Sequence, residues 1–195
     1  MGRNEIKRII KKSIRGLGYR APEVLIEKAK KREYGNYATN ILKVKPFKET
    51  KSGFCGPASL KMVLDYFGLK KSERELAKLS GTTKEKGVET KELLRTAKKL
   101  GFKGFIKDFS QISDIKKYVL QKKIPVIVDW FSRDEGHSSV VVGINNKNIY
   151  LQDPELGKLR KLNLETFKRV WFDFPGRFLR SKKDIIIRRM LVLDK

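Results

Sequence analysis

A single cysteine and a single histidine occur in the 195-residue chain, and each lies in a local sequence that suits thiol chemistry. Cys55 lies in GFCGPAS at residues 53–59, and His137 opens the apolar run HSSVVVGI. Asp153 follows in YLQDP and completes a Cys, His, Asp order along the chain. A thiol attacks carbon as its thiolate, and a base has to take up and return the proton. These residue types predict a nucleophile, a base and a carboxylate that orients the base.

Cys55 comes at the start of a predicted helix over residues 56–67, through which an apolar stripe runs at helical spacing. The first N–H groups of a helix have no acceptor within the helix, and together with the helix dipole they favour a negative charge at Cys55. Pro57 suits the first turn, because its missing N–H is no loss there. Gly56 has no side chain, so we expect it to leave room for a substrate backbone.

His137 and Asp153 belong to a predicted hairpin. Its strands run over residues 137–144 and 148–152, and residues 145–147 form the tight turn between them. The strands are antiparallel, so we expect the two side chains to face each other at the ends far from the turn. There the carboxylate is close enough to orient the imidazole.

The residues shortly before His137 are candidates for lining a substrate cleft, since they precede it in the same loop. They are Asp129, Trp130, Arg133 and Gly136. Trp130 equally suits a place in the hydrophobic core.

Helices come mainly first in the chain and strands second. The patterns predict helices over 56–67, 72–80, 90–100, 113–121 and 164–172, the second opened by a capping box and the fourth by a Ser113 cap. They predict strands over 102–109, 124–130, 137–144, 148–152 and 184–193. This segregation favours an α+β domain over alternating βαβ units.

A basic amphipathic helix is expected near the N-terminus, where Ile6, Ile10 and Ile14 recur four residues apart among lysines and arginines. We therefore expect two parts, a basic N-terminal appendage over 1–45 and a catalytic domain over 46–195.

The central part of the chain, residues 47–157, resembles the papain-like cysteine peptidases that remove leader peptides after double-glycine sites, the bacteriocin-processing peptidases and their stand-alone relatives. The residues that carry the likeness are CGPASLKMVLDYFG at 55–68, IPVIV at 124–128, GHSSVVVG at 136–143 and DPELG at 153–157. The resemblance implies a papain-like fold, in which a helical half packs on an antiparallel sheet.

The same resemblance implies the residue roles. Cys55 is the expected nucleophile, His137 the general base and then acid, and Asp153 the orienting carboxylate. The implied reaction is hydrolysis of a peptide or isopeptide bond in a peptide or protein substrate, through an acyl-enzyme thioester. No metal and no cofactor are expected, and one cysteine with one histidine argue against a dedicated zinc site.

One position departs from the family pattern. Six residues before the nucleophile the family has a glutamine that helps bind the oxyanion, and this chain has Glu49. A carboxylate repels a developing oxyanion, whereas an amide N–H stabilises it, so reduced activity is one expectation. Glu49 can serve when it is protonated, or Thr50 or Ser52 can donate instead.

The chain is strongly basic, with 46 Lys and Arg against 22 Asp and Glu and a formal net charge of +24. An anionic partner such as nucleic acid would neutralise this charge, although surfaces rich in Lys and Glu also occur without one in proteins from high-temperature organisms. The sequence KREYGNYATNI at 31–41 resembles the N-terminal tRNA-contacting module of arginyl-tRNA synthetases, with Asn36 in place of an aspartate. The alternative function is therefore nucleic-acid binding by a peptidase-like scaffold.

No apolar run has the length of a membrane span, and the first residues form no signal-peptide core. We therefore expect a cytoplasmic protein. A lone cysteine forms no internal disulfide, which agrees with a reducing compartment. The sequence leaves the oligomeric state open.

Overall fold

The computed structural model describes residues 41–133, 135–176 and 178–195. Most of the N-terminal appendage expected over 1–45 lies outside these residues, so this boundary stays a prediction. The described residues before 46 belong with the sheet. The backbone N–H of Leu42 donates to the carbonyl of Val142 at 2.8 Å, and the Gln152 amide donates to the carbonyl of Val44 at 2.9 Å.

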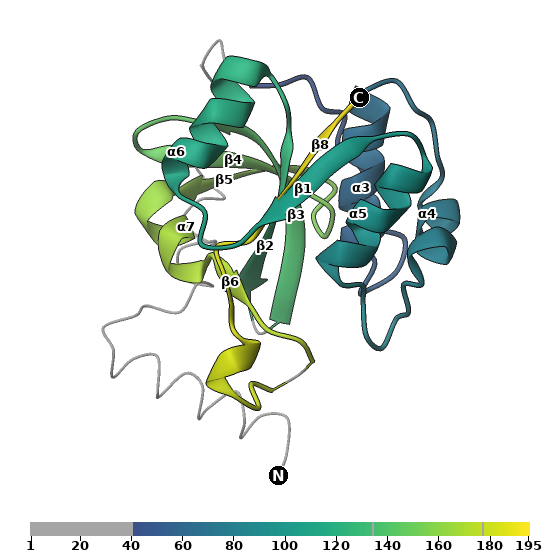
Figure 1. Ribbon diagram of the computed structural model, residues 1–195. Helices are drawn as coiled ribbons and strands as arrows, with labels where there is room; N and C mark the ends of the chain where they lie inside the picture. Colours follow the sequence, from purple (N-terminus) through teal and green to yellow (C-terminus); the bar gives the residue numbers. More distant parts are fainter. Residues whose placement is uncertain (1–40, 134, 177) are drawn as a thin grey trace. The chain divides into compact units, whose positions relative to one another are not determined.

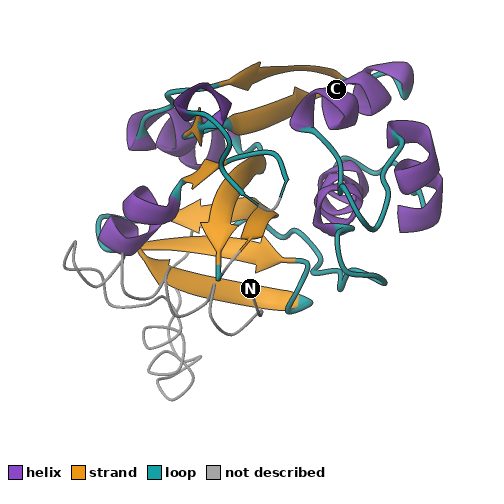
Figure 2. Cartoon of the chain, turned by 90° about the horizontal axis from the view of Figure 1, so that it is seen from below, coloured by secondary structure: helices purple, strands orange, loops and turns teal. Residues whose placement is uncertain are grey.

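Three helices, α3 (Cys55–Tyr66), α4 (Glu73–Ser80) and α5 (Thr90–Lys99), lie together on one side of the sheet (Figures 1 and 2). Leu60, Val63 and Leu64 of the predicted stripe are fully buried in α3, whereas Phe67, the residue after the helix, is only partly buried. The helix ends before Gly68, whose φ of 87° is a conformation that glycine adopts readily. The local sequence thus ends the Cys55 helix after three turns.

Helix α4 begins with the predicted capping box. The Ser72 hydroxyl accepts the backbone N–H of Glu75 at 3.2 Å, and the Glu75 carboxylate accepts the N–H of Ser72 at 2.8 Å. Two N–H groups that a helix start leaves without acceptors are thereby satisfied. Helix α5 begins at Thr90 as predicted.

The main sheet has six antiparallel strands in the order β1-β8-β2-β3-β4-β5. Their bounds are β1 (Lys103–Lys107), β2 (Val126–Ser132), β3 (Glu135–Ile144), β4 (Asn148–Asp153), β5 (Lys158–Asn163) and β8 (Met190–Asp194). β2 pairs with both β8 and β3, and its first five residues are all buried. The apolar run of the sequence around 126–130 is thus the centre of the sheet.

The second pair of helical elements lies on the side of the sheet away from α3 (Figure 1). Helix α6 (Ile112–Lys116) continues into a π-helical segment η1 (Lys117–Lys122), and α7 is Leu164–Val170. The predicted Ser113 cap is wrong. Gln111 is the cap, because its N–H donates to the Asp114 carboxylate at 2.7 Å.

The last predicted strand, 184–193, is wrong as one element. The chain forms a 3-10 turn η2 (Lys182–Asp184), then β7 (Ile186–Ile187), which pairs with β6 (Phe172–Asp173), and then β8. The break comes at Arg188, whose φ is 49°, a left-handed conformation that no strand continues through. Its N–H donates to the carbonyl of Trp171 at 3.0 Å. One hydrophobic stretch thus serves two sheets.

The hairpin of β3 and β4 has the predicted turn. The Asn145 side chain accepts the N–H groups of Lys147 and Asn148 at 2.9 and 2.7 Å. The pairing register shifts between Val141 and Gly143, which places one extra residue in β3. Because of this β-bulge, each side chain of β3 beyond it points to the other face of the sheet than it would without the extra residue.

Among the described residues, no helix combines the length and the apolar composition needed to cross a bilayer.

Candidate active site

Cys55 is the first residue of α3 and is partly exposed. No acidic residue lies in the first turn of this 12-residue helix. The N–H groups of that turn and the positive end of the helix dipole therefore face the thiol without a competing carboxylate on the helix. Cys55 thus lies at the helix start where the sequence placed it.

His137 is buried, at 7% exposure, and its Nε2 lies 3.0 Å from Oδ1 of Asp153. A carboxylate only accepts hydrogen bonds, so Nε2 carries the proton and donates it. The other ring nitrogen, Nδ1, is then the one available to Cys55, with which the imidazole also hydrogen-bonds. The structure thus brings together the three residues that the sequence singled out.

The β-bulge puts His137 and Asp153 on the same face of the sheet. Val141 pairs with Leu151, and side chains two or four residues away along each strand point to the same side. Had the pairing of Gly143 with Tyr150 continued without the shift, every side chain beyond it in β3 would point to the opposite face. The extra residue is therefore required for the contact.

The electrostatics of the site favour a charged imidazole. Burial by itself lowers the pKa of His137, but the hydrogen bonds to Asp153 and Cys55 and their negative charge outweigh it. The net result is a pKa well above the ordinary 6.5. For Asp153, burial acts to raise the pKa, and the contact with His137 and the charge of Arg160 lower it overall. The carboxylate is thus held ionised beside the imidazole.

Asp153 is held from several directions. Its Oδ1 also accepts the N–H groups of Glu155 and Leu156 at 2.9 and 3.3 Å, in the turn that follows β4. Its Oδ2 lies 2.8 Å from Nη1 of Arg160, on β5. The carboxylate is only 1% exposed and cannot rotate without losing these contacts.

Trp130 forms a wall beside the imidazole. It pairs with His137 in the β2–β3 ladder, and the two rings meet edge to face with centroids 5.7 Å apart. Its indole N–H donates to the Ser139 hydroxyl at 3.1 Å, which fixes the ring. At 4% exposure Trp130 is a core residue that also touches the site, so both expectations for it describe part of its position.

A serine one turn along α3 ties the helix to the histidine strand. The Ser59 hydroxyl donates to the carbonyl of Ser138 at 3.1 Å, and Ser59 is fully buried. Ser59 is four residues after Cys55, and Ser138 directly follows His137. The bond therefore fixes the position of α3, and with it the Cys55 thiol, relative to the strand that carries His137.

Glu49 lies beside the site, in the segment that leads into α3. Its backbone N–H donates to the carbonyl of Pro154 at 2.9 Å, next to Asp153. Its Oε2 is buried and has no hydrogen-bond partner among the described residues. Burial first, and then the negative charges of Glu155, Glu73 and Asp153, raise its pKa to about 7 against the opposing effect of His137. A neutral, protonated Glu49 is thus accessible near neutral pH.

The alternative donors next to Glu49 are placed differently. The N–H of Thr50 donates to the Glu73 carboxylate at 3.1 Å, and its hydroxyl donates to the same group. Glu73 is buried, so this clamp holds the segment in place. Ser52 is exposed. Thr50 has its donors engaged away from the site, and the expectation that it replaces the glutamine loses its support.

Gly56 does not leave the open approach that we expected. A Cβ at this position would lie 2.4 Å from Cγ1 of Val88, so the place of a side chain is already filled. The glycine allows the segment before α5 to pack against α3. Gly136 is similar, since a Cβ there would lie 2.1 Å from Oδ1 of Asp173.

Asp129 points away from His137. It pairs with Ser138, and neighbouring residues of a strand alternate between faces. Its carboxylate accepts the hydroxyl protons of Ser138, at 2.8 Å, and of Thr90 at the start of α5. Burial raises its pKa despite these bonds. Arg133 is exposed and pairs with Glu155 at 2.6 Å, at the edge of the site.

His137, Asp153 and Glu155 offer ligand atoms within 4.8 Å of one another, as a metal site would. Both carboxylates already face guanidinium groups, those of Arg160 and Arg133. A cation between them would meet two fixed positive charges at close range. The arrangement suits an ion-pair network better than a metal.

Three residues of the site were not found from the sequence: Ser59, Asp173 and Arg160. Arg160 lies on β5, a strand that the sequence analysis did not predict. Its alternation is hidden, because the buried position between Leu159 and Lys161 is an arginine. The local signal for Arg160 is that it follows two carboxylates, Asp153 and Glu155, closely in the sequence.

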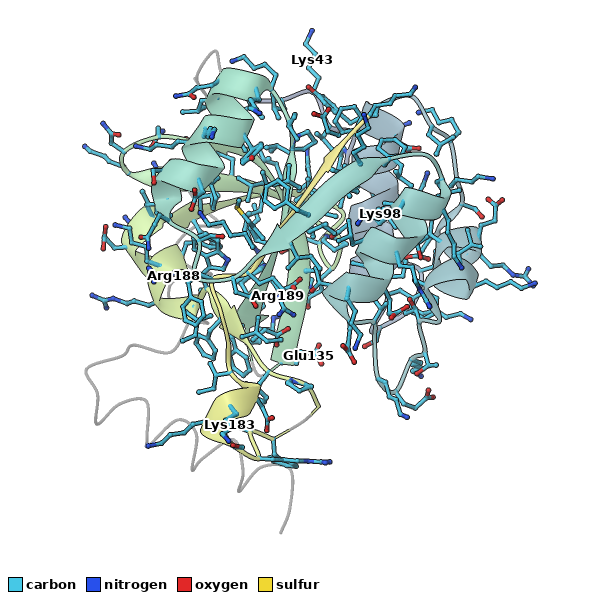
Figure 3. The ribbon with its side chains drawn as sticks, in the orientation of Figure 1. Lys43, Lys98, Glu135, Lys183, Arg188 and Arg189 are labelled. Carbon is cyan, nitrogen blue, oxygen red and sulfur yellow. The ribbon has the colours of Figure 1, made fainter. Side chains whose placement is uncertain are left out.

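Basic side chains are distributed over the described part of the chain rather than gathered at the site. Figure 3 shows Lys43, Lys98 and Lys183 at separate places, on the segment before α3, on α5 and in η2. Some are paired locally, as Lys91 is with Glu89 at 2.8 Å. Nucleic-acid binding and a cytoplasmic location stay predictions.

Solved structures of peptidases share the fold of this chain. A double glycine motif protease from an AMS/PCAT transporter, solved in complex with the leader peptide, superposes with a TM-score of 0.61 at 22% identity, covering 80% of this chain and 94% of that one. A C39-like peptidase from Bacillus anthracis gives 0.61 at 17% identity, covering 82% and 98%. The α+β fold is that of the papain-like cysteine peptidases, as the sequence predicted.

The sequence comparison gives the family. The chain belongs to the Peptidase C39 family, whose profile matches residues 43–174. An uncharacterized protein of Methanothermobacter marburgensis is 33% identical over 125 residues, which are 62% of this chain and 78% of the relative. By family and fold the chain is a cysteine peptidase.

Proposed function

We propose that the chain hydrolyses a peptide bond with Cys55 as nucleophile, His137 as proton carrier and Asp153 as the group that orients His137. The observation that carries this proposal is the hydrogen-bonded line from the Asp153 carboxylate through the buried imidazole to the thiol at the start of α3. A nucleophile, a base and an orienting group in hydrogen-bond contact are the arrangement that covalent catalysis requires.

The steps follow from this order. The Cys55 thiolate attacks the carbonyl carbon, and the imidazolium of His137 gives a proton to the departing amine. A thioester with Cys55 remains. Water then attacks the thioester while His137 takes up a proton, and release of the carboxylic acid restores the thiolate and the imidazolium. Throughout, the Asp153 carboxylate keeps Nε2 protonated and Nδ1 turned to the reacting groups.

We propose further that the oxyanion is bound by the N–H groups at the start of α3 and by the Glu49 carboxyl in its protonated form. Its buried, unpartnered Oε2 and its pKa of about 7 support this role. A neutral carboxyl can donate one hydrogen bond, as the amide of a glutamine does. Above pH 7 the same group carries a charge that repels the oxyanion. We therefore expect activity to fall as the pH rises above 7.

The substrate class that we propose is a peptide with two adjacent glycines before the cleaved bond. Membership of the Peptidase C39 family supports it, as does the fold shared with a double glycine motif protease that binds a leader peptide. An isopeptide substrate is the variant of this proposal that the chemistry of a thioester also allows.

A peptide library tests the proposed function. Peptides with a Gly-Gly pair at a fixed position and varied flanking residues are incubated at pH 6 with the full chain and with its Cys55→Ala variant, and products are read by mass spectrometry. We expect cleavage after Gly-Gly with the unchanged chain only. Lys98→Ala, an exposed change on α5, serves as a control that retains cleavage. Equal cleavage by Cys55→Ala would rule out Cys55 as the nucleophile.

A further inference from the structure

Arg160 is a buried arginine, at 6% exposure, on the strand next to Asp153. It pairs with Leu151 in the β4–β5 ladder, so its side chain lies on the same face of the sheet as that of Asp153, two residues further along β4. Its Nη1 lies 2.8 Å from Oδ2 of Asp153 and donates to the Ser132 hydroxyl at 3.3 Å. The fold therefore directs this guanidinium to the outer oxygen of the orienting carboxylate.

Arg160 also contacts Trp130, the aromatic residue beside His137. Its guanidinium carbon lies 5.4 Å from the centroid of the Trp130 ring, and that ring meets His137 edge to face. An arginine over an aromatic face is held by the ring as well as by its ion pair. One side chain thus braces both the carboxylate and the indole that border the imidazole.

A buried carboxylate beside an imidazolium raises a chemical difficulty. In a site shielded from water, an uncompensated negative charge binds the imidazolium proton strongly. That proton has to pass to the leaving amine during the reaction. A positive charge on the far side of the carboxylate weakens its hold on the proton while leaving the hydrogen bond in place.

We propose that Arg160 is a positioning residue for the proposed peptidase reaction, which fixes the orientation of Asp153 and offsets its charge, so that Asp153 orients His137 without retaining its proton. This inference rests on the proposed function of Cys55 and His137. It assigns to the Asp153–Arg160 pair the role of a neutral, rigid hydrogen-bond acceptor.

The charged and titratable groups around Asp153 come from every element packed against it. His137 faces it from β3 and Arg160 from β5. Glu155 lies in the turn after β4, and Glu49 faces the site from the segment before α3. Apart from the His137 imidazolium, Arg160 is the cation among these groups that pairs with Asp153.

The test follows the ionisation of His137 without peptide turnover. The rate at which iodoacetate alkylates Cys55 is measured from pH 4 to 11 in the Glu49→Gln background, so that Glu49 does not titrate. The reagent is an anion attracted by the imidazolium, and its rate therefore falls when His137 loses its proton. Since Cys55 is the only cysteine, labelling has no background from other thiols.

We expect Arg160→Met to move the alkaline fall of this profile upward by about one pH unit, because the charge of Asp153 is no longer offset. Arg160→Lys keeps a cation there and is expected to show less than half of that shift. Lys98→Met, which removes one exposed charge, is the matched control and leaves the profile unchanged. An unmoved alkaline fall in a folded Arg160→Met would overturn the proposal, even if its melting temperature dropped.

A second pair of variants covers the case in which Arg160→Met does not fold. Asp153→Asn alone leaves the guanidinium buried without its partner and is expected to destabilise the fold strongly. The double variant Asp153→Asn/Arg160→Met removes both charges, so we expect it to melt above Asp153→Asn and to alkylate Cys55 with a wild-type-like alkaline fall. A double variant with no gain over the worse single variant would contradict a shared role.

The two proposals fail in distinguishable ways. If the unchanged protein alkylates Cys55 at pH 6 as slowly as its urea-unfolded form does, the peptidase reading itself is wrong. If the unchanged protein is activated and only the Arg160 variants fail to shift, the reaction stands and Arg160 is merely structural.

Discussion

His137 Nε2 lies 3.0 Å from Oδ1 of Asp153, although the two residues are 16 positions apart and lie on strands whose pairing register slips between them. The register shift at Val142 exchanges the two faces to which the side chains at the far end of β3 point. The imidazole of His137 therefore points to the carboxylate of Asp153. A local irregularity of one strand thus determines whether the site can form.

Glu49→Gln should extend activity to higher pH. The ionisation of Glu49 near pH 7 places a negative charge where the oxyanion forms, and an amide has no such ionisation. At pH 8 about one tenth of Glu49 is still protonated, so we expect the variant to cleave about 10-fold faster than the unchanged chain, with little difference at pH 5.5. Initial rates of cleavage of one Gly-Gly peptide across pH 5 to 9 measure this.

The control for this change is Glu165→Gln, which removes a similar charge from an exposed residue of α7. Its profile should match that of the unchanged chain. If Glu49→Gln loses activity at pH 8 as the unchanged chain does, a protonated Glu49 is not the oxyanion donor.

Ser59→Ala should reduce activity more than its effect on folding explains. The lost hydrogen bond to the Ser138 carbonyl lets α3 shift relative to His137. We expect kcat/KM to fall about 10-fold and the free energy of unfolding to fall by about 1 kcal/mol. Urea unfolding and peptide cleavage give the two quantities.

Ser80→Ala is the matched comparison. Ser80 is a buried helical serine whose hydroxyl donates to Leu76 in its own helix, α4, so its loss costs stability without moving the thiol. Equal losses of activity in the two variants would mean that the Ser59 bond has no special part in placing Cys55.

Gly136→Ala should disturb the strand that carries His137. The new methyl group would lie 2.1 Å from Oδ1 of Asp173, too close for either atom to remain in place. We expect a lower melting temperature and at least a 10-fold loss of cleavage, because movement at residue 136 displaces the imidazole next to it. Adding Asp173→Ala removes the obstacle. The double variant should therefore melt and cleave nearly as Asp173→Ala alone does. If Gly136→Ala costs as much in the Asp173→Ala background as in the unchanged chain, the steric explanation is wrong.

Asp173 should make the fold less stable as the pH rises. Burial first, and then the nearby negative charge of Asp129, raise its pKa from 3.8 to about 7. A raised folded-state pKa of an acid gives stability that is fully present below pH 3.8 and is lost as the pH rises through 7. Asp173→Asn has no such ionisation, so the difference in melting temperature between variant and unchanged chain should grow in favour of the variant from pH 4 to pH 8. A difference independent of pH would refute this.

The sequence alone was enough to single out the candidate residues whose types are rare in this chain. Cys55 and His137 are unique, and a helix start and a hairpin are local patterns that place them without knowledge of the whole fold. The helix at Cys55, the capping box at Ser72 and the turn at 145–147 all depend on residues within a few positions of one another. They are correct for that reason.

What the sequence did not provide depends on contacts between distant segments. The slip at Val142 and the break at Arg188 are set by how strands pair, which residue types there do not reveal. The strand around Arg160 was missed because its buried position is a charged residue. Burial of that charge is possible only because Asp153 pairs with it, and this partner is on another strand. Gly56 is filled by Val88, a contact between segments about thirty residues apart in sequence.

The most direct test of the central claim is the rate at which iodoacetamide alkylates Cys55 at pH 6, compared between the unchanged protein and His137→Ala. An ordinary thiol, with a pKa of about 8.5, is almost entirely protonated at this pH. The account predicts that Cys55 reacts roughly 10- to 100-fold faster than it does in the urea-unfolded chain and that His137→Ala abolishes this advantage. Equal rates in the folded, unfolded and His137→Ala proteins would contradict an activated nucleophile at Cys55.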